Sequence, residues 1–283
     1  MSYNIRIVPI RKVRKLVKSA LAEDIGSGDI TTNTIIPPKK NIAAKIITKE
    51  TGVIAGLAVA KEVFRSVSSK IKFTRKLRDG QRANAGKVIA VIKGPARGIL
   101  AAERTALNFL QKLSGIATLT AKFVKTAGSR VQLLDTRKTS PGLRMLEKYA
   151  VFSGGGRNHR FGLYDAVLIK DNHLVVAGSL KKAVRLAKKR YGKVEVETKT
   201  LKQVKEAIEA GANRIMLDNM SIADIKKAVR SIKKAKRKIE IEASGGINLS
   251  NIKKVSGTGV DFISIGALTH SAKALDICLK IIG

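Results

Sequence analysis

The second half of the chain alternates short apolar segments with amphipathic helical patterns, and this alternation limits the folds that it can adopt. Helical patterns such as 179–192 and 200–212 separate the apolar segments, so we expect parallel strands joined by crossovers. In a parallel α/β barrel the strand ends open on one face, where active sites are built. We therefore predict an enzyme with an α/β fold and a C-terminal parallel α/β barrel. The six apolar segments are 131–135, 166–169, 194–197, 214–217, 239–243 and 262–266.

The first hundred residues follow a different pattern. Strand-like segments at 42–48, 70–77 and 87–94 surround one helical pattern at 58–67, and glycine-containing turns separate them. Such turns suit an antiparallel sheet with one face toward solvent. We predict an N-terminal α+β domain over residues 1–100 and a catalytic domain over residues 101–283, which starts with a long helical lead-in.

The chain is strongly basic, with 56 Lys and Arg against 21 Asp and Glu and a formal charge of +35. This excess is typical of proteins that bind anionic substrates, nucleic acid or a membrane surface. Only 4% of the residues are aromatic and tryptophan is absent, which disfavours a stacking platform for nucleic acid. No segment approaches the ~20 apolar residues that a membrane span requires. We therefore expect neither a specific nucleic-acid partner nor a membrane.

The chain contains a single cysteine, Cys278, near its C-terminus. One cysteine excludes an intrachain disulfide and favours a reducing cytoplasm. The apolar residues around Cys278 predict a buried position within a C-terminal helix.

Basic residues follow the first barrel strand and recur in a glycine-rich segment. Arg137 and Lys138 follow Asp135 and Thr136 just after this strand, where a solvated basic pair is the simple alternative. Residues 153–165 contain three consecutive glycines followed by His159 and Arg160. Exposed main-chain N–H groups and arginine forks together suit an anion, although three glycines also suit a hinge. We expect a site for carboxylate groups here.

Two acidic residues end neighbouring apolar strands. A carboxylate at the position of Glu197 or Asp218 needs a cation, a metal ion or a reacting proton to offset its burial. Glu195 shares a face with Glu197, which lies nearer the predicted mouth. The alternative for each acid is a salt bridge with Lys138 or Lys170. Two carboxylates beside a phosphorylated substrate suit Mg²⁺.

The last two strand patterns run into small, polar loops. Ser244, Gly245 and Gly246 precede a helical pattern, and Gly266 and His270 occupy the next loop. Main-chain N–H groups of such loops bind phosphate, and loops at adjacent late strands commonly form the phosphate site of a barrel. We expect a phosphate group at these loops.

Several motifs, in their order and spacing, resemble one enzyme family along nearly the whole chain. The segments AERTALNFLQKLSGIAT, LLDTRKTSPGLR, SGGGRNHRFGLYDAVLIKDNH, ASGGIN and SIGALTHS are similar to those of the nicotinate-nucleotide pyrophosphorylases (carboxylating), or quinolinate phosphoribosyltransferases. The resemblance implies an N-terminal α+β sandwich-like domain and a barrel of fewer than eight strands. It also implies a homodimer or higher homo-oligomer with shared active sites. The implied reaction converts quinolinate and phosphoribosyl pyrophosphate, with Mg²⁺, to nicotinate mononucleotide, pyrophosphate and CO₂ for NAD biosynthesis.

The resemblance also implies roles for individual residues. It assigns the quinolinate carboxylates to cationic side chains, which are Arg137, His159, Arg160, Lys170 and a neighbouring subunit's Arg104. It assigns catalysis to Lys138, Glu197 and Asp218, of which the two acids also bind the metal ion. It assigns phosphate binding to Ser244, Gly245, Gly246, Gly266 and His270. This sequence departs from the family pattern at Thr198 and Lys199, which puts the choice between Glu195 and Glu197 in question.

A related enzyme of the same fold that acts on nicotinate or another heterocyclic acid is the alternative. Nicotinate carries one carboxylate and requires fewer cationic donors than quinolinate. The four cations Arg104, Arg137, Arg160 and Lys170 favour the diacid.

Overall fold

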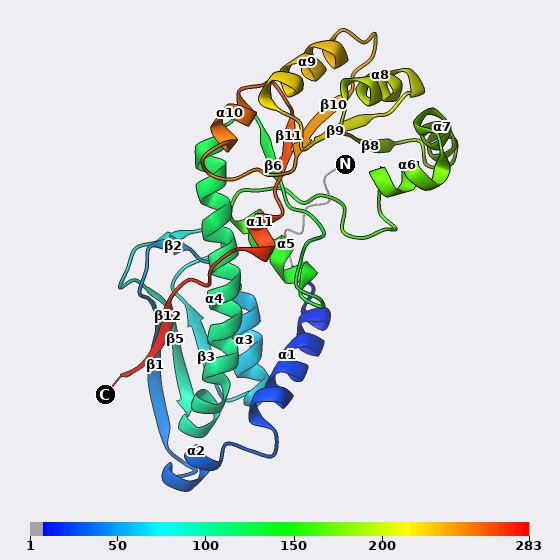
Figure 1. Ribbon diagram of the computed structural model, residues 1–283. Helices are drawn as coiled ribbons and strands as arrows, with labels where there is room; N and C mark the ends of the chain where they lie inside the picture. The colour runs from blue at the N-terminus through cyan, green and yellow to red at the C-terminus, as the bar shows by residue number, and fades with distance from the viewer. Residues whose placement is uncertain (1–7, 283) are drawn as a thin grey trace. The chain divides into compact units, whose positions relative to one another are not determined.

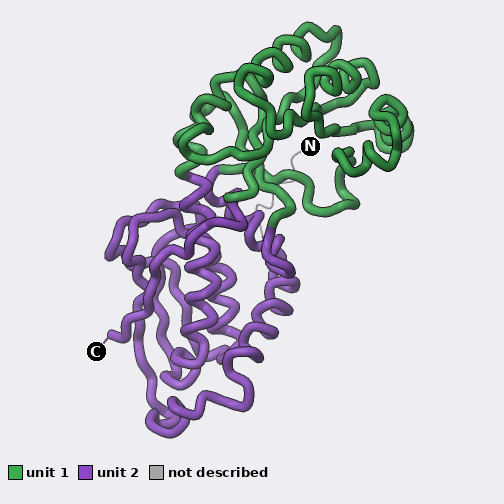
Figure 2. Tube along the Cα trace, viewed as in Figure 1, with its two compact units in different colours: residues 1–3, 122–138, 156–267 green, residues 4–121, 139–155, 268–283 purple. Residues whose placement is uncertain are grey.

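The computed structural model describes residues 8–282, which form two compact units (Figures 1 and 2). The barrel unit contains 122–138 and 156–267, and the sheet unit contains 8–121, 139–155 and 268–282. The helix α4 (Ala96–Ala127) runs from one unit into the other. Because each unit collects separate segments, the structure does not test a single domain boundary near residue 100. No helix among the described residues is long and apolar enough to cross a membrane.

The barrel unit contains a sheet of six parallel strands in the order β6-β11-β10-β9-β8-β7. Its barrel-like arrangement with helices confirms the predicted α/β fold with fewer than eight strands. Arg157 adds a parallel bridge beside Leu134, at the free edge of β6. The strands are β6 (Gln132–Leu134), β7 (Val167–Ile169), β8 (Val194–Thr198), β9 (Arg214–Asp218), β10 (Glu240–Ser244) and β11 (Phe262–Ser264).

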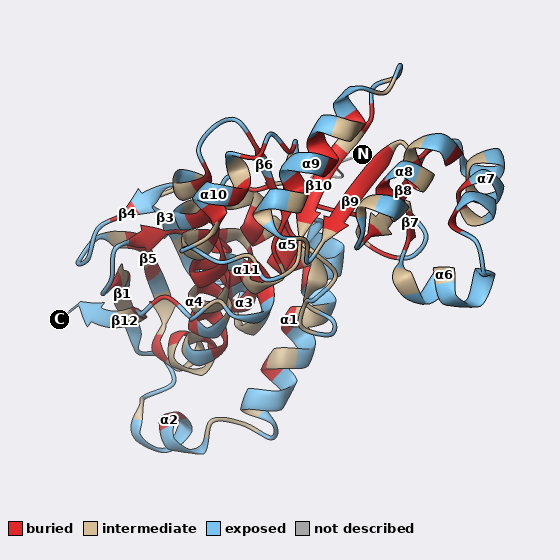
Figure 3. Ribbon diagram, turned by 45° about the horizontal axis from the view of Figure 1, so that its top comes forward, coloured by how far each residue is buried: buried red, intermediate tan, exposed pale blue. Residues whose placement is uncertain are grey.

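The two faces of this sheet differ in chemistry. Alternating residues such as Val196, Ile215 and Ile241 are buried and apolar. The other face is polar, because the strand register places Glu195 beside Arg214 and Asp218 beside Ser244. Successive side chains of a strand point to opposite faces, so one face supplies packing and the other supplies chemistry. Figure 3 shows β9 and β10 as buried segments.

Amphipathic helices connect the central strands of the barrel unit. Ser179, Thr200 and Ser221 precede α7, α8 and α9, and each side chain accepts a hydrogen bond from a main-chain N–H of the first turn. These N-caps satisfy donors that a helix start leaves open. The barrel-unit helices after α4 are α6 (Asp171–Ala177), α7 (Leu180–Tyr191), α8 (Leu201–Ala210), α9 (Ile222–Lys233), α10 (Ile252–Ser256) and the start of α11 (Ala267–His270).

The sheet unit contains a four-stranded antiparallel sheet in the order β12-β1-β5-β3, which confirms the predicted antiparallel sheet. A two-stranded sheet of β2 and β4 accompanies it. The strands are β1 (Asn41–Thr48), β2 (Gly52–Val53), β3 (Lys72–Arg75), β4 (Arg82–Ala83), β5 (Val88–Pro95) and β12 (Ile277–Ile282). The helices are α1 (Ile10–Ile25), α2 (Ile30–Ile35), α3 (Leu57–Val67), α5 (Arg144–Ser153) and part of α4.

The C-terminal segment corrects one prediction. Cys278 lies in β12 and not in a helix, and it pairs with Ile47 of β1. Its side chain is half-buried. The apolar pattern of a short segment does not distinguish a helix from a strand, and only pairing with β1 settles it.

Candidate active site

Two acidic side chains lie at the carboxyl ends of neighbouring strands. Glu197 of β8 and Asp218 of β9 are both half-buried, unlike the apolar residues before them. Burial raises the pKa of Glu197, and the negative charges of Asp218 and Asp171 raise it further. Lys170 and Lys199 oppose this effect but do not cancel it. The carboxylates therefore form a site of excess negative charge that a cation would stabilise.

The structure separates the two candidate acids of β8. Glu195 is 9% exposed, and its carboxylate lies 3.2 Å from the ring nitrogen Nε2 of His159. Glu197 lies two residues closer to the carboxyl end of the strand, where Asp218 influences it. The two acids therefore face different partners, although they share one face of the sheet.

The loop after β10 is held against the loop after β9. Gly245 and Gly246 have φ angles of 88° and 61°, which favour glycine. A Cβ atom on Gly245 would collide with the side-chain amide of Asn219. The main-chain N–H of Asn219 donates a hydrogen bond of 2.9 Å to the carbonyl of Ser244. The close approach of the two loops requires glycine and brings the predicted phosphate loop to the same end of the sheet as Asp218.

The glycine-rich segment is anchored alongside β6 by Asp135, which is fully buried. Its carboxylate accepts hydrogen bonds from Asn158 Nδ2 at 2.7 Å and from the main-chain N–H of His159 at 2.9 Å. The main-chain N–H of Arg157 donates to the carbonyl of Leu133 at 2.7 Å. These contacts bring His159 into the interior, so this part of the segment has defined hydrogen-bond partners. The sequence pattern shows Asp135 at a strand end but not this anchoring role.

Four side chains form what we call the buried ion network: His159, Glu195, Arg214 and Glu242. His159 Nε2 lies 3.6 Å from Glu242 Oε1, and Arg214 Nη1 lies 3.2 Å from Glu242 Oε2. Burial lowers the pKa of His159, but the charges of Glu195 and Glu242 outweigh burial and raise it above its usual value. Burial and the nearby charge of Glu195 raise the pKa of Glu242 to about 7.

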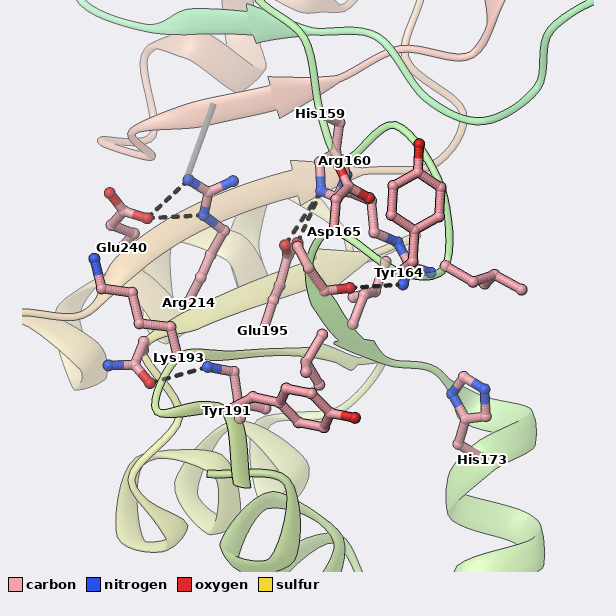
Figure 4. Close-up of a pocket in the computed structure, with 16 residues that line it drawn as sticks. His159, Arg160, Tyr164, Asp165, His173, Tyr191, Lys193, Glu195, Arg214 and Glu240 are labelled. Carbon is pink, nitrogen blue, oxygen red and sulfur yellow. Dashed lines mark hydrogen bonds and ion pairs between the residues drawn. The ribbon is translucent and has the colours of Figure 1, made fainter. Parts of the chain in front are cut away.

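A cavity of about 390 Å³ opens beside this network (Figure 4). Its lining includes Arg160, Tyr164, Glu195 and Arg214. Burial lowers the pKa of Arg160, and the positive charge of Arg137 lowers it further. An anion near both guanidinium groups would offset this repulsion.

The other predicted site residues lie at different places. Lys138 and Lys170 are exposed after β6 and β7, and the main-chain N–H of Lys170 donates to His173 Nδ1 at 2.9 Å. Gly266 is half-buried after β11. Arg104 and His270 are exposed and belong to the sheet unit, so the barrel unit by itself contains neither.

Sequence reasoning missed Arg214 and Glu242. Both lie in β-strands on the face that carries the mouth residues, at even spacing from Asp218 and Ser244 respectively. That spacing was a usable signal for the face of the sheet. It did not identify which charged side chains meet, because the order of the strands is a tertiary property.

A parallel sheet with acids, a basic pair and a glycine loop at its strand ends defines a barrel-type enzyme for anionic substrates. Residues 116–280 match the model of the quinolinate phosphoribosyl transferase C-terminal domain, and residues 29–114 match that of the N-terminal domain. This chain belongs to the quinolinate phosphoribosyl transferase family.

Individual relatives agree with this assignment. The chain is 43% identical over 274 residues to a probable nicotinate-nucleotide pyrophosphorylase [carboxylating] of Bacillus subtilis (strain 168), which covers 95% of this chain and 93% of that protein. It is 43% identical over 292 residues to a chloroplastic protein of the same name from Arabidopsis thaliana, covering 96% of this chain and 84% of that one. The structure of the nicotinate-nucleotide pyrophosphorylase from Francisella tularensis matches with a TM-score of 0.93 at 44% identity, over 100% of both chains.

Proposed function

We propose that this chain transfers a phosphoribosyl group from phosphoribosyl pyrophosphate to quinolinate, with loss of CO₂, in NAD biosynthesis. Membership of the family supports the reaction, and the tobacco relatives are named quinolinate phosphoribosyltransferase [decarboxylating]. The observation that carries the proposal is the mutual repulsion of two guanidinium groups, Arg137 and Arg160, together with the buried His159, which lines the same cavity as Arg160. This arrangement suits a small, planar dianion.

The cationic side chains bind and orient quinolinate in this proposal. Arg137, Arg160 and His159 face its two carboxylates, and Lys170 extends the cluster from the end of β7. Arginine presents paired N–H groups that match the two oxygens of a carboxylate. Holding the pyridine ring in one orientation places its nitrogen for attack and removes much of the entropic cost of bringing two anions together.

The acids at the strand ends hold the metal ion and the ribose end of the second substrate. Glu197 and Asp218 offer oxygen ligands, and their mutual repulsion is relieved by a divalent cation, so the residues present fit Mg²⁺. Mg²⁺ would neutralise charge on the pyrophosphate oxygens. The main-chain N–H groups of Ser244, Gly245 and Gly246 suit the phosphate of the ribose, together with the loop after β11.

Bond changes follow in two stages. The bond from ribose C1 to the pyrophosphate oxygen breaks with its electrons on oxygen, and the carboxylates stabilise the positive charge that develops on the ribose. Lys138 lies between the substrates in this proposal and offsets their negative charge. The pyridine nitrogen then bonds to C1 and becomes cationic. The bond to the adjacent carboxylate breaks as CO₂ leaves, and its electron pair stays on the ring carbon, which takes up a proton.

The number of cationic donors distinguishes quinolinate from the alternative substrate nicotinate. A monoacid would leave one buried cationic group without its anion, which is costly. The test measures CO₂ release and nicotinate mononucleotide formation from quinolinate, and mononucleotide formation from nicotinate, each with phosphoribosyl pyrophosphate and Mg²⁺. We expect turnover of quinolinate only. Comparable turnover of both acids would contradict the assignment.

We further propose a homodimer or higher homo-oligomer in which Arg104 enters a neighbouring subunit's site. Arg104 is exposed on α4 and is not at a barrel strand end. The variants Arg104→Ala and Arg137→Ala should each be nearly inactive. In a mixture of the two, hybrid dimers contain one intact site, so about a quarter of the activity should return if subunits exchange at random. No recovery, with exchange shown by a tag pull-down, would place Arg104 outside a shared site.

A further inference from the structure

The buried ion network lies on the polar face of the sheet, and three of its four members have no role in the function proposed above. Glu195 comes from β8, Arg214 from β9 and Glu242 from β10, while His159 comes from the glycine-rich segment. Arg214 and Glu242 are 6% and 0% exposed. Four ionisable groups from four separate segments therefore meet in the interior, where charge is costly unless it is paired.

When Glu195 and Glu242 are both ionised, the charges of the four-residue network balance if the imidazole of His159 is cationic. Two carboxylates then face one guanidinium and one imidazolium, whereas a neutral imidazole leaves an uncompensated negative charge in the interior. An unpaired buried charge is strongly destabilising. Burial works against a cationic His159, but the charges of Glu195 and Glu242 outweigh it, and Arg214 opposes them. The main chain at His159 is fixed separately by Asp135.

The same atoms are also close enough to be metal ligands, since His159, Glu195 and Glu242 offer atoms that lie within 4.8 Å of one another. Arg214 argues against a metal ion here. Its Nη1 lies 3.2 Å from Glu242, its Nη2 lies 2.7 Å from Glu240, and its guanidinium lies 4.1 Å from the centre of the Phe262 ring. Ser264 Oγ also donates to Glu242. A guanidinium already supplies the counter-charge and would repel a divalent cation.

We propose that Glu195 is a positioning residue for the proposed reaction: its carboxylate holds the His159 ring cationic and in one orientation, so that it can bind a carboxylate of a pyridine dicarboxylate substrate. Glu195 Oε2 lies 3.2 Å and Oε1 3.3 Å from His159 Nε2, so both oxygens face the ring nitrogen. Burial works against an ionised Glu195, but His159 and the charge of Arg214 outweigh burial and lower the pKa of Glu195. The inference rests on the proposed function for the identity of the substrate, but the contact between Glu195 and His159 does not.

The chain contains only three histidines, at 159, 173 and 270, which makes a direct spectroscopic test practical. Imidazole ¹⁵N NMR of the full-length protein without substrate gives three sets of ring signals, and the variants His173→Gln and His270→Gln assign them. In the wild type, we expect the midpoint of the His159 titration to lie above the ordinary value of about 6.5. A wild-type midpoint at or below that value would overturn the proposal, whether or not any variant folds.

Glu195→Gln keeps the shape of the side chain and removes its charge. We expect the midpoint of His159 to fall by about one unit or more, because the nearest carboxylate is gone. The matched control is Glu209→Gln, which removes an exposed carboxylate of the barrel unit that pairs with Lys181. The control should leave His159 unchanged. An unchanged His159 in Glu195→Gln would overturn the proposal.

Kinetics separate positioning from a general structural defect. We expect Glu195→Gln to raise KM for quinolinate about 10- to 100-fold, the loss that one charge-assisted contact produces, with KM for phosphoribosyl pyrophosphate nearly unchanged. Glu195→Asp retains the charge and should recover part of this loss. Equal increases in both KM values would overturn the positioning role. Absence of quinolinate turnover in the wild type would refute the proposed function instead, while the NMR result would still decide whether Glu195 controls His159.

Discussion

Glu242→Gln should make the stability of this protein less dependent on pH. Glu242 is fully buried in β10, and burial together with the charge of Glu195 raises its pKa from 4.5 to about 7, against the opposing effects of His159 and Arg214. A carboxyl group whose pKa is higher in the folded state contributes stability that is fully present below its unfolded pKa. That contribution is lost as the pH rises through the folded pKa.

The magnitude follows from this shift. One pKa unit corresponds to about 1.4 kcal/mol, so a rise from 4.5 to about 7 corresponds to a loss on the order of 3 kcal/mol of unfolding free energy between pH 4.5 and pH 8. Glutamine resembles the protonated acid in shape and carries no charge. The variant should therefore match the wild type near pH 5 and be more stable than the wild type at pH 8, although it loses the ionic contact with Arg214.

Urea unfolding followed by far-ultraviolet circular dichroism measures the effect, since the chain has no tryptophan. The comparison requires both proteins at pH 5 and at pH 8. Glu209→Gln is the control, because Glu209 is exposed, its pKa is lowered by Lys181, and it is ionised at both pH values. A difference in unfolding free energy between Glu242→Gln and the wild type that does not change with pH would refute the reasoning. A wild type that becomes more stable relative to the variant at pH 8 than at pH 5 would also refute it.

Three further predictions concern the site, the packing and the surface charge. Glu197→Gln and Asp218→Asn should each lower turnover at saturating substrate with little change in quinolinate affinity, measured by steady-state kinetics and calorimetry. A large loss of quinolinate affinity would contradict the placement of the two acids at the ribose and the metal ion. Gly115→Ala should cost about 1 to 3 kcal/mol in urea unfolding, because its Cβ would collide with the carbonyl of Lys273, whereas Gly257→Ala meets only ordinary contacts. The protein should bind a labelled oligonucleotide weakly, and its affinity should fall about a thousandfold or more between 50 and 200 mM salt, measured by fluorescence anisotropy. Tight, salt-resistant binding to one sequence would contradict this prediction.

Much of the fold follows from local patterns in the sequence. The apolar segments and the helical patterns between them predicted every strand of the six-stranded sheet, and the parallel pairing followed from the crossovers. Periodicity is a property of neighbouring residues, so it is readable without the tertiary structure. The same reasoning placed Glu197 and Asp218 at the carboxyl ends of adjacent strands, because the end of a strand is also a local feature.

Contacts between distant segments required the tertiary structure. The segment around Cys278 is a strand only because β1 offers it a partner, and an isolated apolar run has no such preference. Asp135 accepts a hydrogen bond from the main-chain N–H of His159, although the two residues are 24 positions apart in the sequence.

The buried ion network shows the same division. Alternation in the sequence placed Glu195 on the face of Glu197, but only the strand order brings Arg214 of β9 between the acids of β8 and β10. The pKa values of His159 and Glu242 depend on burial and on charged neighbours from other segments. Sequence by itself therefore determined the six strands of the barrel unit, which of their residues share a face of the sheet, and which residues lie at their carboxyl ends. The tertiary structure decided which charges meet in the interior, because electrostatic coupling depends on distance in space and not on distance along the chain.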